Sequence, residues 1–167
     1  MLLIPQRVLL VFHLSGQTAA LPLESAQRIV PMAQLARPLG LPSLLEGILN
    51  LGGRVAPVLR LDRLLHLPLQ RLGLYSTLII VNGVSDGRVA ILVDRVSEIL
   101  TVPESALLPI GEEDSFNACA VAAVFVQGQM VPLLSPARIL LEKEREALSQ
   151  FQAMAQRRLQ DWEPQAL

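Results

Sequence analysis

The chain has 167 residues, of which 51% are hydrophobic and 17% are charged, and its formal net charge is −1. This composition indicates a globular protein with a sizeable core and excludes a disordered chain. Acidic and basic residues that nearly cancel give no electrostatic footprint for nucleic acid or for an anionic membrane. The single cysteine excludes an internal disulfide framework and suits a reducing compartment.

No segment of the sequence predicts a membrane anchor. The longest uninterrupted apolar run, Ala118–Val126, has nine residues, about half of what a membrane-spanning helix needs. The apolar N-terminus lacks the basic segment of a signal peptide, and Pro5, Arg7 and His13 interrupt it. We therefore expect a cytoplasmic protein whose first strand covers Arg7–Leu14.

Short strands at close spacing fill most of the chain, and this spacing indicates small closed β-barrels. After the first strand, in chain order, we expect a strand over Thr18–Leu23, a kinked strand or single helical turn over Glu24–Val30, a loop or bent edge strand over Pro31–Pro42, a hairpin and short helix over Leu45–Leu65, and strands over Ser76–Val81, Arg88–Val93, Asp94–Val102, Ala118–Val126 and Met130–Leu134.

The hairpin within Leu45–Leu65 is the most informative element. Gly52 and Gly53 permit the positive φ angles that a tight turn between twisted strands requires. Pro57 lies in the second strand of the hairpin. Because proline cannot donate to a strand ladder, we expect this strand at a sheet edge or near a bulge.

A long helix is predicted from Ser135 and Pro136, a good capping and first-turn pair, to Trp162. Two interpretations of its apolar stripe remain open: the helix packs back onto a barrel, or it pairs with a partner helix or a second copy. The stripe comprises Leu141, Leu148, Phe151, Ala155, Leu159 and Trp162.

Two blocks of sequence recur in the same order. Ala20–Glu24 matches Ala90–Asp94, and Gly53–Leu65 matches Gly128–Leu140 at a slightly larger offset, because the second half contains a longer loop. Agreement in turn, proline and following helix favours a duplicated unit. We expect one subdomain over residues 7–70, a second over residues 71–141, and a helical tail over residues 142–167.

The residues predict no active site. Cys119 lies in an apolar strand, where a free cysteine is usually a packing group. His13 and His66 have no further ligands at metal-binding spacing, and Asp62 and Asp94 favour turn or cap roles over a carboxylate pair. We therefore expect no catalysis, no metal and no cofactor, and a protein that binds other proteins.

Four segments stand out as a set of motifs. In chain order they are L-L-V-F-H-L, E-G-I-L-N-L-G-G-R-V-A-P-V-L-R-L, R-V-A-I-L-V-D-R-V-S-E-I-L and M-V-P-L-L-S-P-A-R-I-L-L. Together they resemble CheW-like domains, the coupling proteins of bacterial chemosensory arrays. The resemblance places a CheW-like domain over residues 1–141. It implies a mainly β fold, with two SH3-like five-stranded β-barrel subdomains packed side by side and a C-terminal α-helix.

The resemblance also implies a non-catalytic adaptor that couples the cytoplasmic tip of a methyl-accepting chemotaxis receptor to the regulatory domain of a CheA-type histidine kinase. The receptor would lie in the groove between the barrels, and the barrel ends would contact the kinase. No nucleic acid, cofactor or membrane insertion is implied. Carried over by motif, the protein-binding residues are Ala26, Arg28, Ile29, Glu46, Gly47, Asn50, Gly52, Gly53, Arg54, Arg60, Asp94, Val96 and Ile99.

The chain departs from the family pattern at three positions. Gly52 replaces the arginine of N-L-R-G, Arg60 replaces the acid of V-x-D-L, and Arg28 replaces the acid of V-x-E-I/V. Loss of a guanidinium and two inverted charges should change which partner surface is complementary. This favours a divergent coupling protein, of a pilus-type or other non-flagellar system, or a paralogue with weakened coupling.

Two alternatives come from other functional classes. The first is a small ligand-binding or enzymatic β-barrel protein that uses the groove between the barrels, with Cys119 or His66 as the titrating group. The second is a protein that self-associates through the C-terminal helix.

Overall fold

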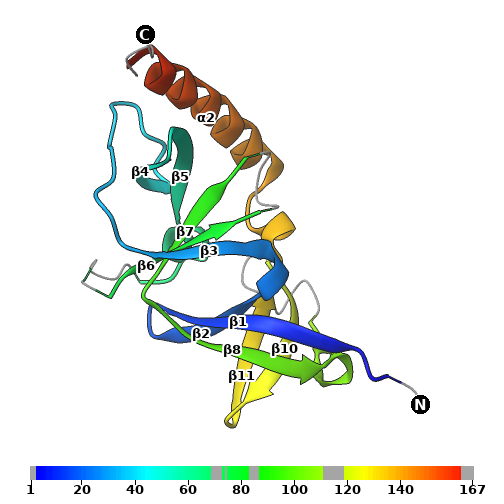
Figure 1. Cartoon of the computed structure of the whole chain (residues 1–167). Helices are drawn as coiled ribbons and strands as arrows, with labels where there is room; N and C mark the ends of the chain where they lie inside the picture. The colour runs from blue at the N-terminus through cyan, green and yellow to red at the C-terminus, as the bar shows by residue number, and fades with distance from the viewer. Residues whose placement is uncertain (1–2, 69–72, 74, 83–86, 111–118, 163–167) are drawn as a thin grey trace.

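This computed structural model describes residues 3–68, 73, 75–82, 87–110 and 119–162. They form two β-sheets and a C-terminal helix (Figure 1). The strands are β1 (Gln6–Leu14), β2 (Gln17–Pro22), β3 (Ala26–Pro31), β4 (Leu45–Leu51), β5 (Arg54–Arg60), β6 (Thr77–Val81), β7 (Val89–Val93), β8 (Arg95–Pro103), β9 (Leu108–Pro109), β10 (Ala120–Val126) and β11 (Gln129–Leu134). The helices are α1 (Leu61–Leu64), α2 (Glu142–Trp162) and the 3₁₀ helices η1 (Leu23–Ser25), η2 (Glu104–Ala106) and η5 (Pro136–Arg138).

The two sheets exchange hairpins between the halves of the chain. Sheet A has the order β8-β1-β2-β11-β10-β9, and sheet B has the order β3-β6-β7-β5-β4. Parallel pairing of β2 with β11, and of β5 with β7, joins strands from different halves. The predicted boundary near residue 70 therefore does not separate the sheets, because each half supplies strands to both.

The irregularities of strand pairing recur at the positions that the sequence repeat relates. The pairing of β4 with β5 shifts register between Leu45 and Gly47, and the pairing of β10 with β11 shifts at the matching positions, Ala120 and Ala122. The register shifts that involve β3 and β8 also fall at matching positions of the repeat. Each half thus builds a hairpin, a strand that crosses between sheets, a second hairpin and a short helix, in that order.

Strand periodicity places both faces of each sheet in apolar surroundings. In β1, Leu9 and Val11 belong to the core of sheet A. Their neighbours Leu10 and Phe12 belong to a central core shared with sheet B, which includes Ile91. Because side chains alternate across a strand, one strand contributes to both cores. Several of the exposed large apolar side chains lie on edge strands and at a hairpin tip.

One strand prediction holds in its second form and one is wrong. Strand β5 lies between β4 and β7 and not at a sheet edge, but the expected bulge is present, because the β4 pairing shifts register opposite Val58 and Leu59, directly after Pro57. Pairing with β7 also begins only at Val58, so no ladder bond is lost at Pro57 on that side. Phe125, predicted in a buried strand, is 62% exposed, because it lies at the tip of the β10–β11 hairpin.

The helix predicted to run continuously from Ser135 is interrupted. Between η5 and α2, Ile139 and Leu140 are buried in the central core. The backbone N–H of Leu141 donates to the side chain of Glu144 at 2.8 Å, so a glutamate three residues into the helix caps its start. In the part of the chain that the structure describes, no helix combines the length and apolarity needed to cross a membrane.

Candidate functional site

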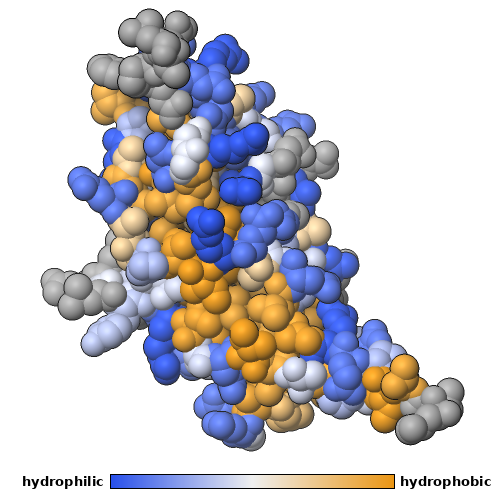
Figure 2. All heavy atoms as spheres, viewed as in Figure 1, coloured by the Kyte–Doolittle hydropathy of each residue, from blue (hydrophilic) through white to orange (hydrophobic). Residues whose placement is uncertain are grey.

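Strands β3 and β8 form corresponding edges of the two sheets. Ile29 on β3 is 43% exposed, and Ile99, at the matching position of the repeat on β8, is 59% exposed. Arg28 and Glu98, their exposed neighbours, carry opposite charges. Figure 2 shows apolar surface extending over the region of β3, β1 and β8. The predicted residues Ala26 and Val96, at equivalent positions, are half-buried.

The turn of the β4–β5 hairpin is built by three of the predicted residues. The φ angles of Gly52 and Gly53 are 61° and 92°, which glycine adopts without steric cost. The side-chain oxygen of Asn50 accepts a hydrogen bond from the Gly53 N–H at 2.8 Å. Arg54, which follows the turn, is exposed. Of these four residues, only Arg54 offers a charge to a partner.

Gly47 serves the backbone of β4. A Cβ atom at this position would lie 2.7 Å from the Leu35 Cβ and 2.9 Å from the Ala36 carbonyl oxygen. Ala36 also forms an isolated antiparallel bridge with Ile48. The glycine therefore allows the preceding loop to lie directly on the strand.

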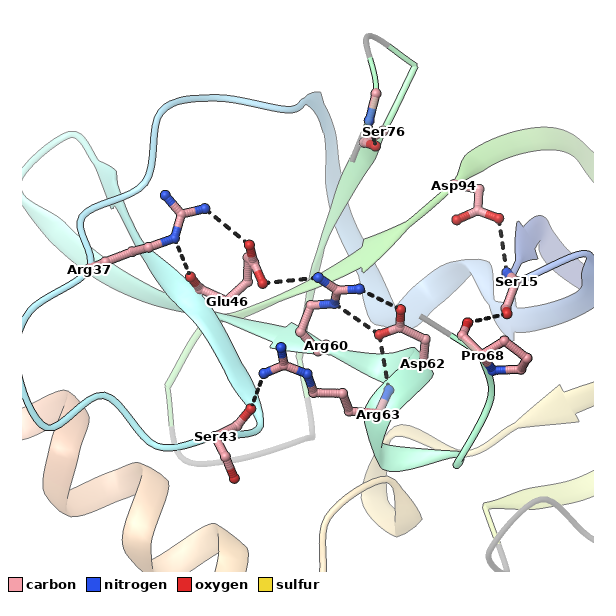
Figure 3. A network of polar contacts seen from close by, with 11 residues as sticks. Ser15, Arg37, Ser43, Glu46, Arg60, Asp62, Arg63, Pro68, Ser76 and Asp94 are labelled. Carbon is pink, nitrogen blue, oxygen red and sulfur yellow. Dashed lines mark hydrogen bonds and ion pairs between the residues drawn. The ribbon is translucent and has the colours of Figure 1, made fainter. Parts of the chain in front are cut away.

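Arg60 lies in a buried ion-pair network (Figure 3). It is 6% exposed, and its guanidinium donates to both carboxylate oxygens of Asp62, at 3.0 and 2.7 Å, and to Glu46 at 3.1 Å. Glu46 also pairs with Arg37 at 3.0 Å. The hydrogen bond to Asp62, and then that to Glu46, raises the pKa of Arg60 further above its ordinary value. The positive charge of Arg60 is therefore paired with carboxylates of the same molecule.

Asp94 has the turn role that the sequence predicts. Its carboxylate accepts a hydrogen bond from the Ser15 N–H at 2.9 Å, and Ser15 has a φ angle of 53°. The contact fastens the β1–β2 turn to the start of β8. Asp62 is likewise at the start of a helix, and accepts a hydrogen bond from the Arg63 N–H at 3.0 Å.

Helix α2 packs on sheet B, so the packing interpretation is confirmed. Leu148 is 1% exposed within the central core, and Phe151 packs against that core. Ala155 and Leu159 are half-buried, whereas Leu141 is 70% exposed. The apolar stripe therefore starts at Leu148 and not at Leu141.

Two glutamines that the sequence analysis missed fasten α2 to β5. Gln156 accepts a hydrogen bond from the Val55 N–H at 2.8 Å and donates to the Gly53 carbonyl at 2.9 Å. Gln152 donates to the carbonyls of Val55 and Arg88, both at 3.3 Å. Four-residue spacing puts both amides on one helix face. This Q-x-x-x-Q spacing was the available signal.

The two groups of the ligand-binding or enzymatic alternative lie in different surroundings, one buried and one exposed. Cys119 is 2% exposed and its Sγ lies 3.3 Å from the Arg138 carbonyl. Burial, and secondarily the charge of Glu144, raises the pKa of the thiol. His66 is exposed at the end of α1. Within the described ranges, no three His, Cys, Asp or Glu residues are placed to hold a metal ion.

Comparison with known proteins finds related chains that cover most of the sequence. A model of the CheW-like domain matches residues 8–144. The chain is similar to a protein named chemotaxis protein CheW from Thermotoga maritima, with 26% identity over 133 residues, 80% of this chain and 87% of that protein. It is also similar to the crystal structure of scaffolding protein TtCheW from Thermoanaerobacter tengcongensis, with a TM-score of 0.76 and 19% identity over 86% of this chain and 94% of that one.

The structural match confirms the predicted fold class. The chain is mainly β, with two SH3-like β-barrel subdomains and a C-terminal helix. Sheet A has six strands and not the five expected, because the two-residue strand β9 adds to its edge.

Proposed function

The chain belongs to the CheW-like domain family, and from this premise we propose that it is a non-catalytic, cytoplasmic adaptor that couples a chemotaxis receptor to a CheA-type histidine kinase. The names of the two similar proteins, chemotaxis protein CheW and scaffolding protein TtCheW, support this role. No cofactor enters the proposal.

The exposed isoleucines Ile29 and Ile99 are the observation that carries the proposal. They lie on the two strands where the chain crosses from one sheet to the other. A receptor helix would bury apolar residues against both edges. The opposite charges of Arg28 and Glu98 would orient that helix, because matched charges fix register more than they add affinity.

The tip of the β4–β5 hairpin is the proposed kinase contact. Arg54 is exposed there and follows the turn that Asn50, Gly52 and Gly53 build. Glu46, Gly47 and Arg60 hold this hairpin in place from inside the fold. They act on kinase binding through the position of the turn.

Adaptor function requires that both partners be held in fixed geometry. Both sheets pack against apolar cores on their two faces. This packing would hold the edge strands β3 and β8 in a fixed position relative to the tip of hairpin β4–β5. A receptor would bias the kinase if the receptor–adaptor assembly has different affinities for the active and inactive states of the kinase.

Titration calorimetry with a receptor signalling-tip fragment and with the kinase regulatory domain tests the proposal. Ile29→Asp and Ile99→Asp should each weaken receptor binding by about tenfold or more and leave kinase binding unchanged. Met154→Asp, at a residue that is 61% exposed on α2, is the matched control. If the folded wild-type chain binds neither partner, the adaptor function is wrong. Equal loss of both partners would contradict the separation of the two surfaces.

A further inference from the structure

Hairpin β10–β11 repeats hairpin β4–β5, yet in the described part of the chain only β4–β5 is covered by a helix. Figure 1 shows α2 beside β4–β5, with β10–β11 at the opposite end of the molecule. Asn50 and Val55 are cross-strand partners and lie in the groove beneath α2. Their counterparts in the second repeat, Phe125 and Met130, are also partners and are 62% and 50% exposed.

The contact of α2 with sheet B depends on a gap between strands. Strands β5 and β7 pair from Val58 onward, and before that point the amides of Gln152 and Gln156 bind the backbone of β5. A Cβ atom at Gly87 would lie 2.5 Å from the Gln152 Nε2. The site is thus shaped to admit two amide side chains.

The equivalent gap in sheet A lies between β2 and β11. These two strands pair at Leu133 and Ala20. In sheet B the corresponding pair is Val58 and Ala90. A groove of about 450 Å³ adjoins this pairing. Its lining includes Gly16, Gln17, Thr18, Gln129, Met130 and Pro132, and every described residue along it is uncharged.

We propose that hairpin β10–β11 binds an amphipathic helix of a partner protein in the way that hairpin β4–β5 holds α2. Apolar residues of that helix cover Phe125 and Met130, which form an exposed apolar pair at the hairpin tip. Two amide side chains, four residues apart, enter the groove between β2 and β11. The occupant presents an uncharged face, because the described lining of the groove offers no charge to pair with.

A second copy of this chain fits the surface less well than a partner does. The α2 helix carries the required amides, but Gln152 and Gln156 are already engaged with β5 of the same molecule. Its buried Leu148 is also held in the central core. A second copy would have to give up both contacts in order to supply its helix.

A synthetic peptide of residues 142–162 is a suitable probe because it has the proposed chemistry. Added to the isotope-labelled full chain, it should shift backbone amide resonances of β2, β10 and β11. Joint Phe125→Ala and Met130→Ala substitution in the chain should weaken binding by about tenfold or more. Joint Gln152→Ala and Gln156→Ala substitution in the peptide should do the same. Leu39→Ala in the chain, at a fully exposed residue elsewhere, should leave affinity unchanged.

Three results would overturn the proposal. The first is absence of binding at millimolar peptide. The second is a set of shifts confined to β4, β5 and β7, which would mean that the peptide only displaces α2. The third is self-association of the full chain that the Phe125 and Met130 substitutions abolish, which would identify a second copy as the occupant. These results test hairpin β10–β11 only. Receptor binding at Ile29 and Ile99 and kinase binding at the β4–β5 tip are measured separately, so this proposal can fail while the adaptor function holds.

Discussion

Hairpins β4–β5 and β10–β11 share a turn, a bulge and a register, but they differ in what supports them. The first is held by a buried ion pair, by a glycine under a loop, and by two glutamines from α2. The second has none of these contacts among the described residues. The repeated backbone therefore specifies the hairpin, and individual side chains decide whether a helix covers it. We call β4–β5, which α2 covers, the closed hairpin, and β10–β11 the open hairpin. At the positions of Glu46, Gly47 and Arg60, the second hairpin has Val121, Ala122 and Ser135.

Removing the arginine of the ion-pair network should give the largest loss of stability. Arg60→Ala leaves Asp62 buried without its strongest partner, and we expect the free energy of unfolding to fall by about 3–5 kcal/mol. Arg37→Ala removes the outer partner of Glu46; the Arg37 side chain is 53% exposed, and its loss should cost at most about 1 kcal/mol. Urea unfolding of both variants makes the comparison. Equal losses would show that the network is not buried in solution.

Detaching α2 from its hairpin should have the next largest effect. Leu148→Ala opens a cavity in the central core and should cost about 2–5 kcal/mol. Met154→Ala, on the exposed face of the same helix, should change stability by less than about 0.5 kcal/mol. Thermal unfolding monitored by circular dichroism measures both. A Leu148→Ala variant as stable as the wild type would mean that the helix is not docked.

A methyl group at Gly47 tests the loop contact of the closed hairpin. Gly47→Ala places an atom against Leu35 and Ala36 and should cost about 1–3 kcal/mol through overpacking. Gly73→Ala is the matched control, since nothing lies within 4 Å of a Cβ there. Similar midpoints in urea for the two variants would contradict the close approach of the loop.

Replacing Cys119, which precedes hairpin β10–β11, should have the smallest effect on stability, and this effect should depend on pH. Its pKa is raised above the ordinary value of 9.0, so the folded chain keeps a proton that the unfolded chain releases. The stability from this thiol is complete below pH 9.0 and is lost as pH rises towards the folded pKa. Urea unfolding between neutral and alkaline pH should show a smaller decline for Cys119→Ala than for the wild type. Parallel declines would contradict the shift.

The sequence predicts local structure well because turns and repeats depend on neighbouring residues. Gly52 and Gly53 predict the hairpin turn, and the internal repeat relates Ile29 to Ile99 on equivalent edge strands. The exchange of hairpins is not predictable in this way, because it depends on parallel pairs such as Val58 with Ala90, which are distant in sequence. The same order of strands along the chain is compatible with exchanged hairpins and with two sheets that each come from one half of the chain.

The side chains of the candidate site show the same limit. The resemblance predicts Arg60 among the protein-binding residues, but Asp62 and Glu46 hold its side chain inside the fold. Only the combination of a base with an acid two residues later hints at this pairing. For the glutamines of α2, the signal is their four-residue spacing, which is also common on solvated helix faces.

The exchange of hairpins makes the fold one cooperative unit. A chain cut between α1 and β6 would give two fragments, each with strands of both sheets and a complete set of neither. Neither fragment could bury its own apolar faces, so each sheet must assemble with the other and unfolding is expected in a single transition. A load applied across β3 and β8 would be borne by the hydrogen-bonded ladders of both barrels at once. The two halves therefore cannot move as separate rigid bodies unless the β2–β11 and β5–β7 pairings break.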